Sequence, residues 1–142
     1  MGIRRSSREL ALKFLYQSEF NEGHSEELVS QFIDQVASKG DVGNYMRKLV
    51  TTIFDHRAEI DSVIQKHSEN WALDRMPLID RNILRMGVCE LLYLDNVPPK
   101  VAINEAVEIA KKFSNDDSPN FINGVLDHIF KDRGISSAIT PP

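Results

Sequence analysis

Apolar residues recur along most of the chain at spacings of three and four, which is the period of an amphipathic helix. Sustained alternation of apolar and polar residues, which would indicate strands, is not found in the sequence. The sequence also has no internal repeat. The pattern therefore predicts an all-α protein of about seven helices packed as two small helical bundles.

The first two predicted helices are marked by start and stop signals. The first begins near Ser6, whose spacing to Glu9 matches a capping box, and it runs to about Phe20. The second follows Ser25 and ends at Gly40. A third begins after residue 43 in the sequence.

Residues 44–67 carry a helical pattern that is equally compatible with one long helix and with two helices that break near Arg57. Residues 68–76 interrupt the pattern. They predict the boundary between an N-terminal lobe of about 1–68 and a C-terminal lobe of about 69–133 within one compact domain.

The boundary segment contains two apolar side chains, Trp71 and Leu73, which we expect to plug the junction of the lobes. Asp74 is placed to cap the next helix, with Pro77 in its first turn. That helix runs to about Leu94 and has the most apolar sequence, so we expect it to be central.

The last two helices are predicted over residues 101–113 and 119–130, and the tail over 134–142 is predicted to be disordered. Ser118 is a plausible N-cap of the final helix. Phe121 lies roughly 90° from the centre of the apolar stripe of that helix. This large ring is therefore expected at the edge of the core, beside a loop.

Length and composition are those of an ordinary globular protein. The chain has 142 residues, of which 42% are apolar and 27% charged, and no apolar run approaches the ~20 residues of a membrane span. The start carries no secretory signal, so we expect a cytoplasmic protein without a membrane partner. Cys89, the single cysteine, lies among apolar neighbours and is expected to be buried.

Residues that could carry catalysis or bind a metal do not form a recognisable pattern. The four histidines lack zinc-site spacings, and the seven glycines form no phosphate-binding turn. We expect a protein that is not an enzyme, with no metal site and no cofactor.

The charge distribution is asymmetric. Residues 1–13 contain four basic residues and one acid, which is +3, so the remainder of a chain with net charge −4 carries −7. Arg4, Arg5 and Arg8 at this end and the ring of Phe121 are the groups that a reader of single-stranded RNA needs, because arginine neutralises phosphate and an aromatic face stacks on an unpaired base.

The first helix also carries a second apolar strip, in which Leu12 and Tyr16 follow Arg5 and Arg8 at helical spacing. Such a strip indicates a docking surface for a partner. Three alternatives remain: another protein covers it, a second copy of the chain covers it in a homodimer, or another helix of the same chain does.

Several motifs resemble those of the NusB family of transcription antitermination factors. The match is strongest over residues 101–111, VAINEAVEIAK, and over 121–127, FINGVLD. It includes the sequence DRNILR at 80–85, and the basic start before Phe14 agrees as well.

The resemblance implies a helical, non-catalytic protein. It would bind boxA RNA jointly with the ribosomal protein NusE in the RNA polymerase antitermination complex. It places Arg4, Arg5 and Arg8 in the RNA-binding start, with Phe121 as the RNA-contacting aromatic. It places Tyr16, Asp74 and Asp80 on the NusE-facing surface, and Asp117 in a loop that tunes RNA engagement.

Two departures from the family pattern predict weak RNA binding without a partner. Ser6 and Ser7 interrupt the basic start, and Asn120 stands where a lysine commonly precedes the phenylalanine. Two other functions are compatible with the sequence: an RNA-binding module related to rRNA cytosine methyltransferases, and a helical adaptor that binds only protein.

Overall fold

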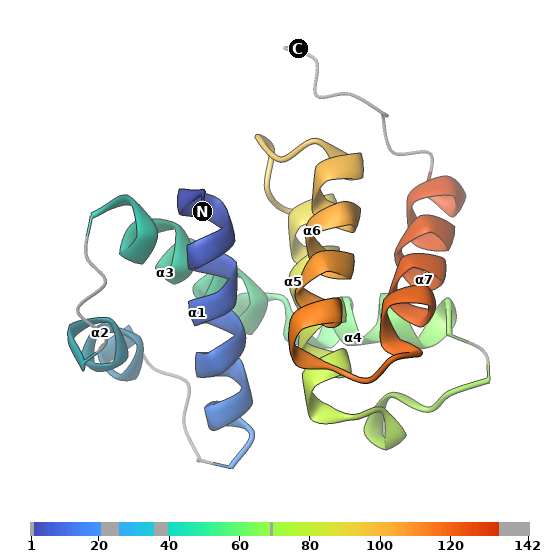
Figure 1. Ribbon diagram of the computed structural model, residues 1–142, viewed down its shortest axis with the longest axis horizontal. Coiled ribbons are helices and arrows are strands. Elements are labelled where there is room, and N and C mark those ends of the chain that lie inside the picture. The colour runs from blue at the N-terminus through green and yellow to red at the C-terminus, as the bar shows by residue number, and fades with distance from the viewer. Residues whose placement is uncertain (1, 21–25, 36–39, 69, 134–142) are drawn as a thin grey trace.

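The computed structural model describes residues 2–20, 26–35, 40–68 and 70–133. These residues form seven α-helices and one 3-10 helix, and among them there is no strand (Figure 1). The elements are α1 (Ile3–Ser18), α2 (Glu26–Gln35), α3 (Asp41–Asp55), α4 (Arg57–Lys66), η1 (Leu73–Arg75), α5 (Leu78–Leu92), α6 (Pro99–Phe113) and α7 (Ser118–Asp132). The prediction of an all-α fold is confirmed.

Helix α5 is the centre of the molecule. It contacts α1, α3, α4, α6 and α7, and every residue from 82 to 91 is buried. Cys89 on this helix is completely buried, as expected, and burial raises the pKa of its thiol. Helices α6 and α7 pack on one side of α5, and α1 packs on α3 and α5 on the other (Figure 1).

The helical pattern over residues 44–67 belongs to two helices. Helix α3 ends at Asp55, and His56 leaves helical geometry with φ −120° and ψ 20° before α4 begins. The imidazole of His56 stacks on the ring of Tyr93 at 4.1 Å between centroids, so the break is held against the end of α5.

Three predicted helix starts are wrong. Helix α1 begins at Ile3, after Gly2, and its N-terminus has no side-chain cap. The carboxylate of Glu9, predicted to complete a capping box, instead accepts from Lys112 at 2.9 Å. Helix α3 begins at Asp41, directly after Gly40, whose φ of 69° requires a glycine.

The third wrong start is that of α5. Asp74 lies in η1, and α5 begins at Leu78 after Pro77 without a side-chain cap. Ser118 likewise begins α7 but does not cap it, because its hydroxyl donates to Asp80 at 2.7 Å.

The boundary segment differs from prediction in one side chain. Leu73 packs partly buried against the core, as expected, but Trp71 is 53% exposed and does not plug the junction. None of the helices in the described ranges is both long and apolar enough to cross a membrane. The tail over 134–142 lies outside the described residues.

Candidate nucleic-acid interface and partner surface

The three arginines at the start of α1 have different surroundings. The Nε atom of Arg8 donates to both carboxylate oxygens of Glu90, at 3.0 and 2.9 Å, and the Arg8 side chain is 5% exposed. The Tyr45 hydroxyl donates to the same carboxylate. The expectation that Arg8 contacts RNA directly is therefore corrected, since its guanidinium is buried and already paired within the core.

Burial governs the ionisation of this cluster. Removal from water raises the pKa of Glu90, while the guanidinium of Arg8 and the bond from Tyr45 act in the opposite direction. Burial and the neighbouring Glu90 carboxylate raise the pKa of Tyr45, so its hydroxyl remains a donor at neutral pH.

Glu105 on α6 joins the buried arginine to an exposed one. Its carboxylate accepts from Nη1 of Arg8 at 3.2 Å and from Nε of Arg5 at 3.0 Å, and Arg5 Nη2 donates to its other oxygen. The bond from Arg5 holds the pKa of Glu105 below its ordinary value. Arg5 is 42% exposed, so its guanidinium is oriented by Glu105 and still reaches solvent.

Arg4 lies over an aromatic face. Its guanidinium carbon is 4.1 Å from the centroid of the Tyr45 ring, which is within the range of a cation–π contact. Arg4 and Arg5 are therefore the basic groups of this cluster that an RNA phosphate can reach.

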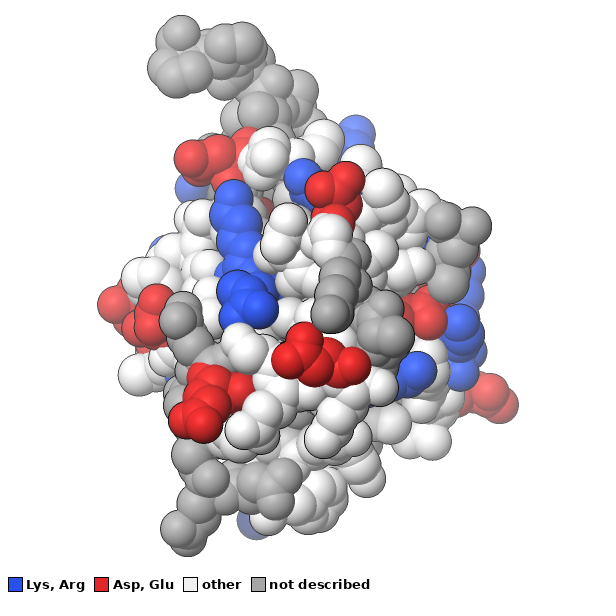
Figure 2. Space-filling model, turned by 90° about the vertical axis from the view of Figure 1, so that its left-hand side faces the viewer, with Lys and Arg blue, Asp and Glu red and all other residues white. Residues whose placement is uncertain are grey.

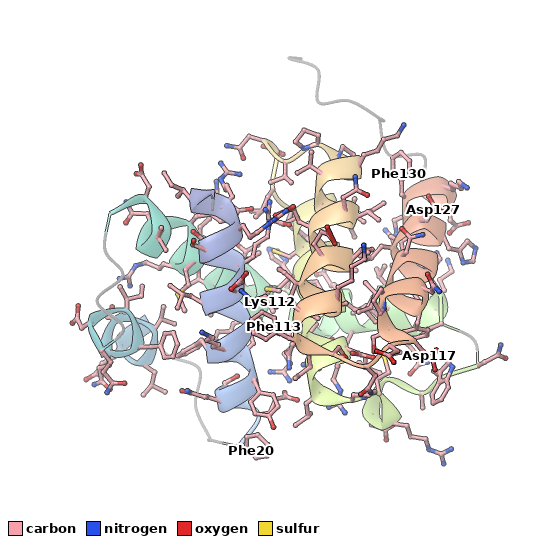
Figure 3. All side chains as sticks on the ribbon, viewed as in Figure 1. Phe20, Lys112, Phe113, Asp117, Asp127 and Phe130 are labelled. Atoms are coloured by element: carbon pink, nitrogen blue, oxygen red, sulfur yellow. The ribbon has the colours of Figure 1, made fainter. Side chains whose placement is uncertain are left out.

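Two lysines that the sequence pattern did not single out lie beside Arg5. Lys111 and Lys112 in the last turn of α6 line a groove of about 310 Å³ together with Arg5 and Glu9. Both lysines are more than half exposed, and Lys112 lies between α1 and α6 (Figure 3). The sequence feature that could have identified them is a pair of adjacent lysines in the last turn of a helix whose other face is apolar.

Phe121 lies in the first turns of α7, half-buried against the core, as its offset from the apolar stripe predicted. Its ring meets the edge of Trp71 at 6.3 Å between centroids. Asn120 beside it is exposed. The residues expected to contact RNA thus lie in two places, one at the start of α1 and one at the start of α7.

The two aspartates near Phe121 differ in accessibility. Asp80 is buried, and its carboxylate accepts from the hydroxyls of Ser114 and Ser118. The expectation that Asp80 faces a partner is corrected, since both of its oxygens are bonded within the chain. Asp117 is exposed at the start of α7 (Figure 3) and lines an open depression of about 440 Å³.

The apolar strip predicted on α1 is present only at its C-terminal end. Leu12 is 3% exposed and belongs to the core, because α1 packs against both α3 and α5. Its predicted contact with a partner is therefore corrected. Tyr16 and Phe20 remain exposed, Phe20 to 66%, and their rings meet edge to face at 5.3 Å.

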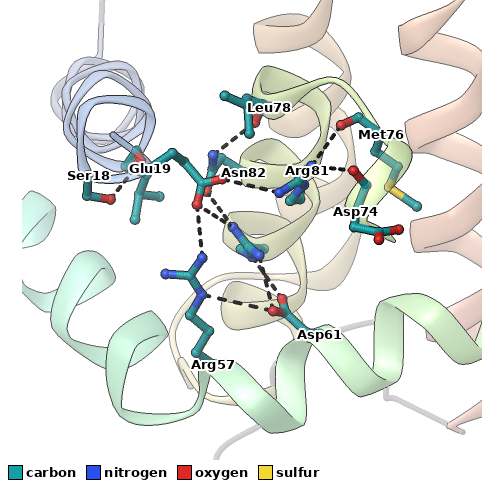
Figure 4. Close-up of polar contacts among 11 residues, drawn as sticks. Ser18, Glu19, Arg57, Asp61, Asp74, Met76, Leu78, Arg81 and Asn82 are labelled. Atoms are coloured by element: carbon teal, nitrogen blue, oxygen red, sulfur yellow. Dashed lines mark hydrogen bonds and ion pairs between the residues drawn. The ribbon is translucent and has the colours of Figure 1, made fainter. Parts of the chain in front are cut away.

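Glu19, between these two aromatics in sequence, joins three helices (Figure 4). Its carboxylate pairs with Arg57 of α4 at 2.9 Å and with Arg81 and Arg85 of α5, each at 3.4 Å. Asp61 of α4 pairs in turn with Arg85 at 2.8 Å.

Arg81 extends this cluster to η1. Its Nη2 atom donates to the backbone oxygens of Asp74 and Met76, each at 3.1 Å (Figure 4). The exposed side chain of Asp74 and the exposed end of α1 are thereby fixed to one set of arginines. The same ion-pair cluster therefore fixes the segments that carry Tyr16 and Asp74, two of the residues predicted to face a partner.

On the side of the molecule that carries α2, acidic and basic side chains are interspersed and separated by uncharged ones (Figure 2). The residues drawn in colour on this side therefore do not form a continuous surface of one charge. Among the described residues, no group of three or more histidines, cysteines or carboxylates could hold a metal ion.

Comparison with known proteins identifies the family. The sequence model of the NusB family matches residues 5–131. The chain belongs to the NusB family. The NusB transcription antitermination protein of Myxococcus xanthus is 44% identical over 133 residues, which cover 91% of this chain and 95% of the relative. The Geobacter sulfurreducens NusB is 44% identical over 130 residues, covering 91% and 94%.

Solved NusB structures share the fold. A crystal structure of antitermination factors NusB and NusE in complex with double-stranded RNA matches with a TM-score of 0.82 and 34% identity, covering 93% of this chain and 98% of that one. The T. maritima NusB matches with a TM-score of 0.83 and 34% identity over 91% of each chain. The chain is a transcription antitermination protein of a non-catalytic family.

Proposed function

We propose that this NusB protein binds boxA-type single-stranded RNA jointly with NusE, and that it does so within the RNA polymerase antitermination complex. The site of action would then be the cytoplasm, where both the transcription machinery and the ribosomal protein are found. Support for a joint complex with NusE and RNA comes from a solved NusB relative that is bound to NusE and double-stranded RNA.

The observation that carries the RNA-binding proposal is the geometry of Arg5. Its guanidinium is oriented by Glu105 at the head of a groove lined by Lys111 and Lys112, and it remains exposed. An oriented arginine loses little side-chain freedom when a phosphate binds, which favours recognition of the RNA backbone. Arg4 would supply a second cation, while Arg8 positions Glu105 from within the core.

Phe121 would contribute a stacking surface for an unpaired base, with Asn120 beside it as a polar contact. Asp117 is exposed close to this ring, where a carboxylate repels an approaching phosphate. We infer that Asp117 weakens RNA binding by the free protein, and that NusE compensates by adding contacts of its own.

The NusE surface would comprise Tyr16 and Phe20 at the end of α1 together with Asp74. An exposed pair of aromatic rings has the composition of a protein-binding site. Leu12 and Asp80 would support this surface from beneath. A homodimer that covers the same aromatics is the competing use of this surface.

The test is the affinity for a fluorescently labelled boxA-type RNA, measured by anisotropy with and without NusE. We expect NusE to tighten binding, and we expect Arg5→Ala and Phe121→Ala each to weaken the ternary complex about fivefold or more, since one stacked base is worth ~1–3 kcal/mol. Lys131→Ala is the control, because Lys131 is exposed at the other end of α7.

Two results would contradict the proposal. If NusE brings no gain in affinity, or if both variants bind as tightly as the control, the protein acts as an adaptor that binds only protein. Light scattering of the free protein, repeated after addition of NusE, distinguishes a homodimer that dissociates from a monomer that recruits NusE.

A further inference from the structure

A second depression lies on the other side of the ring pair formed by Trp71 and Phe121. It has a volume of about 310 Å³, and we call it the notch. Its lining comprises His67, Ser68, Asn70, Trp71, Asn120, Phe121, Gly124 and Val125. It thus combines two aromatic rings with two amide side chains from segments far apart in the sequence.

Gly124 forms part of the floor of the notch and has no structural reason to be glycine. It is exposed in the middle of α7, where glycine is less favourable than any residue except proline. A Cβ atom built there would meet nothing within 4 Å. Neither close packing nor backbone geometry requires the missing side chain, and its effect is to keep the notch open.

Trp71 forms one wall and is held in place through its backbone. Its carbonyl accepts from Gln65 Nε2 at 3.0 Å, and its amide donates to the Ser68 carbonyl, also at 3.0 Å. The indole is nevertheless 53% exposed. A large aromatic side chain on an ordered backbone that leaves half its surface in water is typical of a binding site.

The notch and the depression on the other side of the two rings differ in the charge of the residues that line them. The described lining of that depression includes two carboxylates, Asp80 and Asp117, against one cation, Arg75, so its net charge is negative and disfavours phosphate. Among the described residues that line the notch there is no carboxylate, and the amides of Asn70 and Asn120 offer both donors and acceptors. An aromatic wall with amides at its rim suits the face and the edge of an unpaired base.

We propose that the notch receives one unpaired base of the bound RNA, which stacks on Trp71 while Asn70 and Asn120 bond its edge. Gly124 provides the space for the base. This inference rests on the proposed RNA-binding function and deepens it by naming a second aromatic contact and the pocket that the base enters.

Trp71 is the only tryptophan of the chain and therefore reports on its own contact. BoxA-type RNA is titrated into the protein–NusE complex while tryptophan fluorescence is recorded, with a Trp71→Phe complex as the background for NusE. We expect quenching that saturates with the binding seen by anisotropy. The titration is repeated with a series of RNAs that each lack one base. Only the RNA that lacks the base bound in the notch should fail to quench Trp71.

The notch itself is tested by filling it. Gly124→Leu adds a side chain over the floor, and Asn123→Leu adds one at the neighbouring exposed position, which does not line the notch. We expect Gly124→Leu and Trp71→Ala to weaken RNA binding about 5- to 150-fold, the equivalent of one lost stack, and Asn123→Leu to have no effect. Thermal unfolding should show no loss of stability in Gly124→Leu.

The outcomes separate this inference from the proposed function. If RNA binds with NusE but leaves Trp71 fluorescence unchanged, or if Gly124→Leu binds like Asn123→Leu, the notch proposal is overturned and the RNA-binding proposal stands. If the complex binds no RNA at all, both proposals fail.

Discussion

Arg5 and Arg8 show how the same residue type acquires opposite roles three positions apart. Arg5 is oriented by one carboxylate and exposed, whereas Arg8 is buried between Glu90 and Glu105. A buried ion pair adds little to stability compared with apolar residues, but breaking it leaves an uncompensated charge in the core. Arg8 is thus essential to the core without being accessible to a ligand.

We predict that Arg8→Met lowers the free energy of unfolding by about 3–5 kcal/mol, because Glu90 would lose its buried counter-charge. The deficit should shrink on acidification, since burial raises the pKa of Glu90 and its protonated form needs no counter-charge. Urea denaturation at several pH values measures both effects.

The double variant Arg8→Met, Glu90→Met is the internal control and should lose less stability than the two single variants combined. Arg5→Met, which removes an exposed pair, should cause only a small change. An Arg8→Met protein as stable as Arg5→Met would show that the buried pair is not the constraint inferred from its geometry.

At the residue scale, the sequence predicted on which side of its own helix a side chain lies, but not whether another helix buries it. Helical spacing correctly placed Phe121 at the edge of the core, because the other residues of its own helix define that edge. Arg8, Leu12 and Asp80 were predicted to face ligands, but α5, α6 and α7 supply the groups that cover or bond them. Such contacts join residues about 40 to 80 positions apart, which local periodicity does not encode.

At the scale of elements, Gly87 of α5 leaves room for a side chain of α7. A Cβ atom on Gly87 would lie 2.7 Å from Cδ1 of Leu126, which is closer than atoms pack, and Leu126 is fully buried. The Leu126 side chain therefore occupies the space that a side chain at position 87 would need.

Gly87→Ala should lower the free energy of unfolding by about 1–3 kcal/mol through overpacking, despite the better helix propensity of alanine. Gly124→Ala is the matched control on α7. It should raise stability by about 0.5–1 kcal/mol, because nothing opposes the added Cβ atom. Calorimetry of both variants checks the opposite signs, and equal effects would refute the close approach.

Helix number was more predictable from the sequence than helix starts. Apolar stripes long enough to cover a core identified each helix, but capping rules failed where a polar side chain had a tertiary partner. Ser118 illustrates this: its hydroxyl bonds Asp80 of another helix instead of its own N-terminus. The break at His56 was undecided because the apolar pattern continues across it without interruption.

At the scale of the whole molecule, ion pairs hold both proposed surfaces in place. Glu19 joins α1 to α4 and α5 beside the aromatic pair, and Glu105 joins α6 to the arginines of α1. The division into lobes of about 1–68 and 69–133 stays a prediction. Helix α4, on the N-terminal side of that division, contacts α5 and α7 as well as α3.

The number of accessible cations predicts how salt weakens RNA binding. With Arg4 and Arg5 accessible, about two phosphates are neutralised, which gives a log–log slope of affinity against salt of about −1.4, compared with about −2 if Arg8 also took part. Arg5→Ala should reduce the slope in magnitude by about 0.7, because one of the two phosphate contacts is lost. Anisotropy titrations over a range of salt concentrations measure the slope, with Lys131→Ala as the unchanged control.

Complete burial of Cys89 has a practical consequence for such measurements. Its thiol lies in the last turn of α5 with no exposed surface, and its raised pKa keeps it in the unreactive protonated form. A cysteine introduced on the surface would therefore be the one thiol in the folded chain that a maleimide dye can modify. Site-specific labels for distance measurements can be attached without replacing the native cysteine.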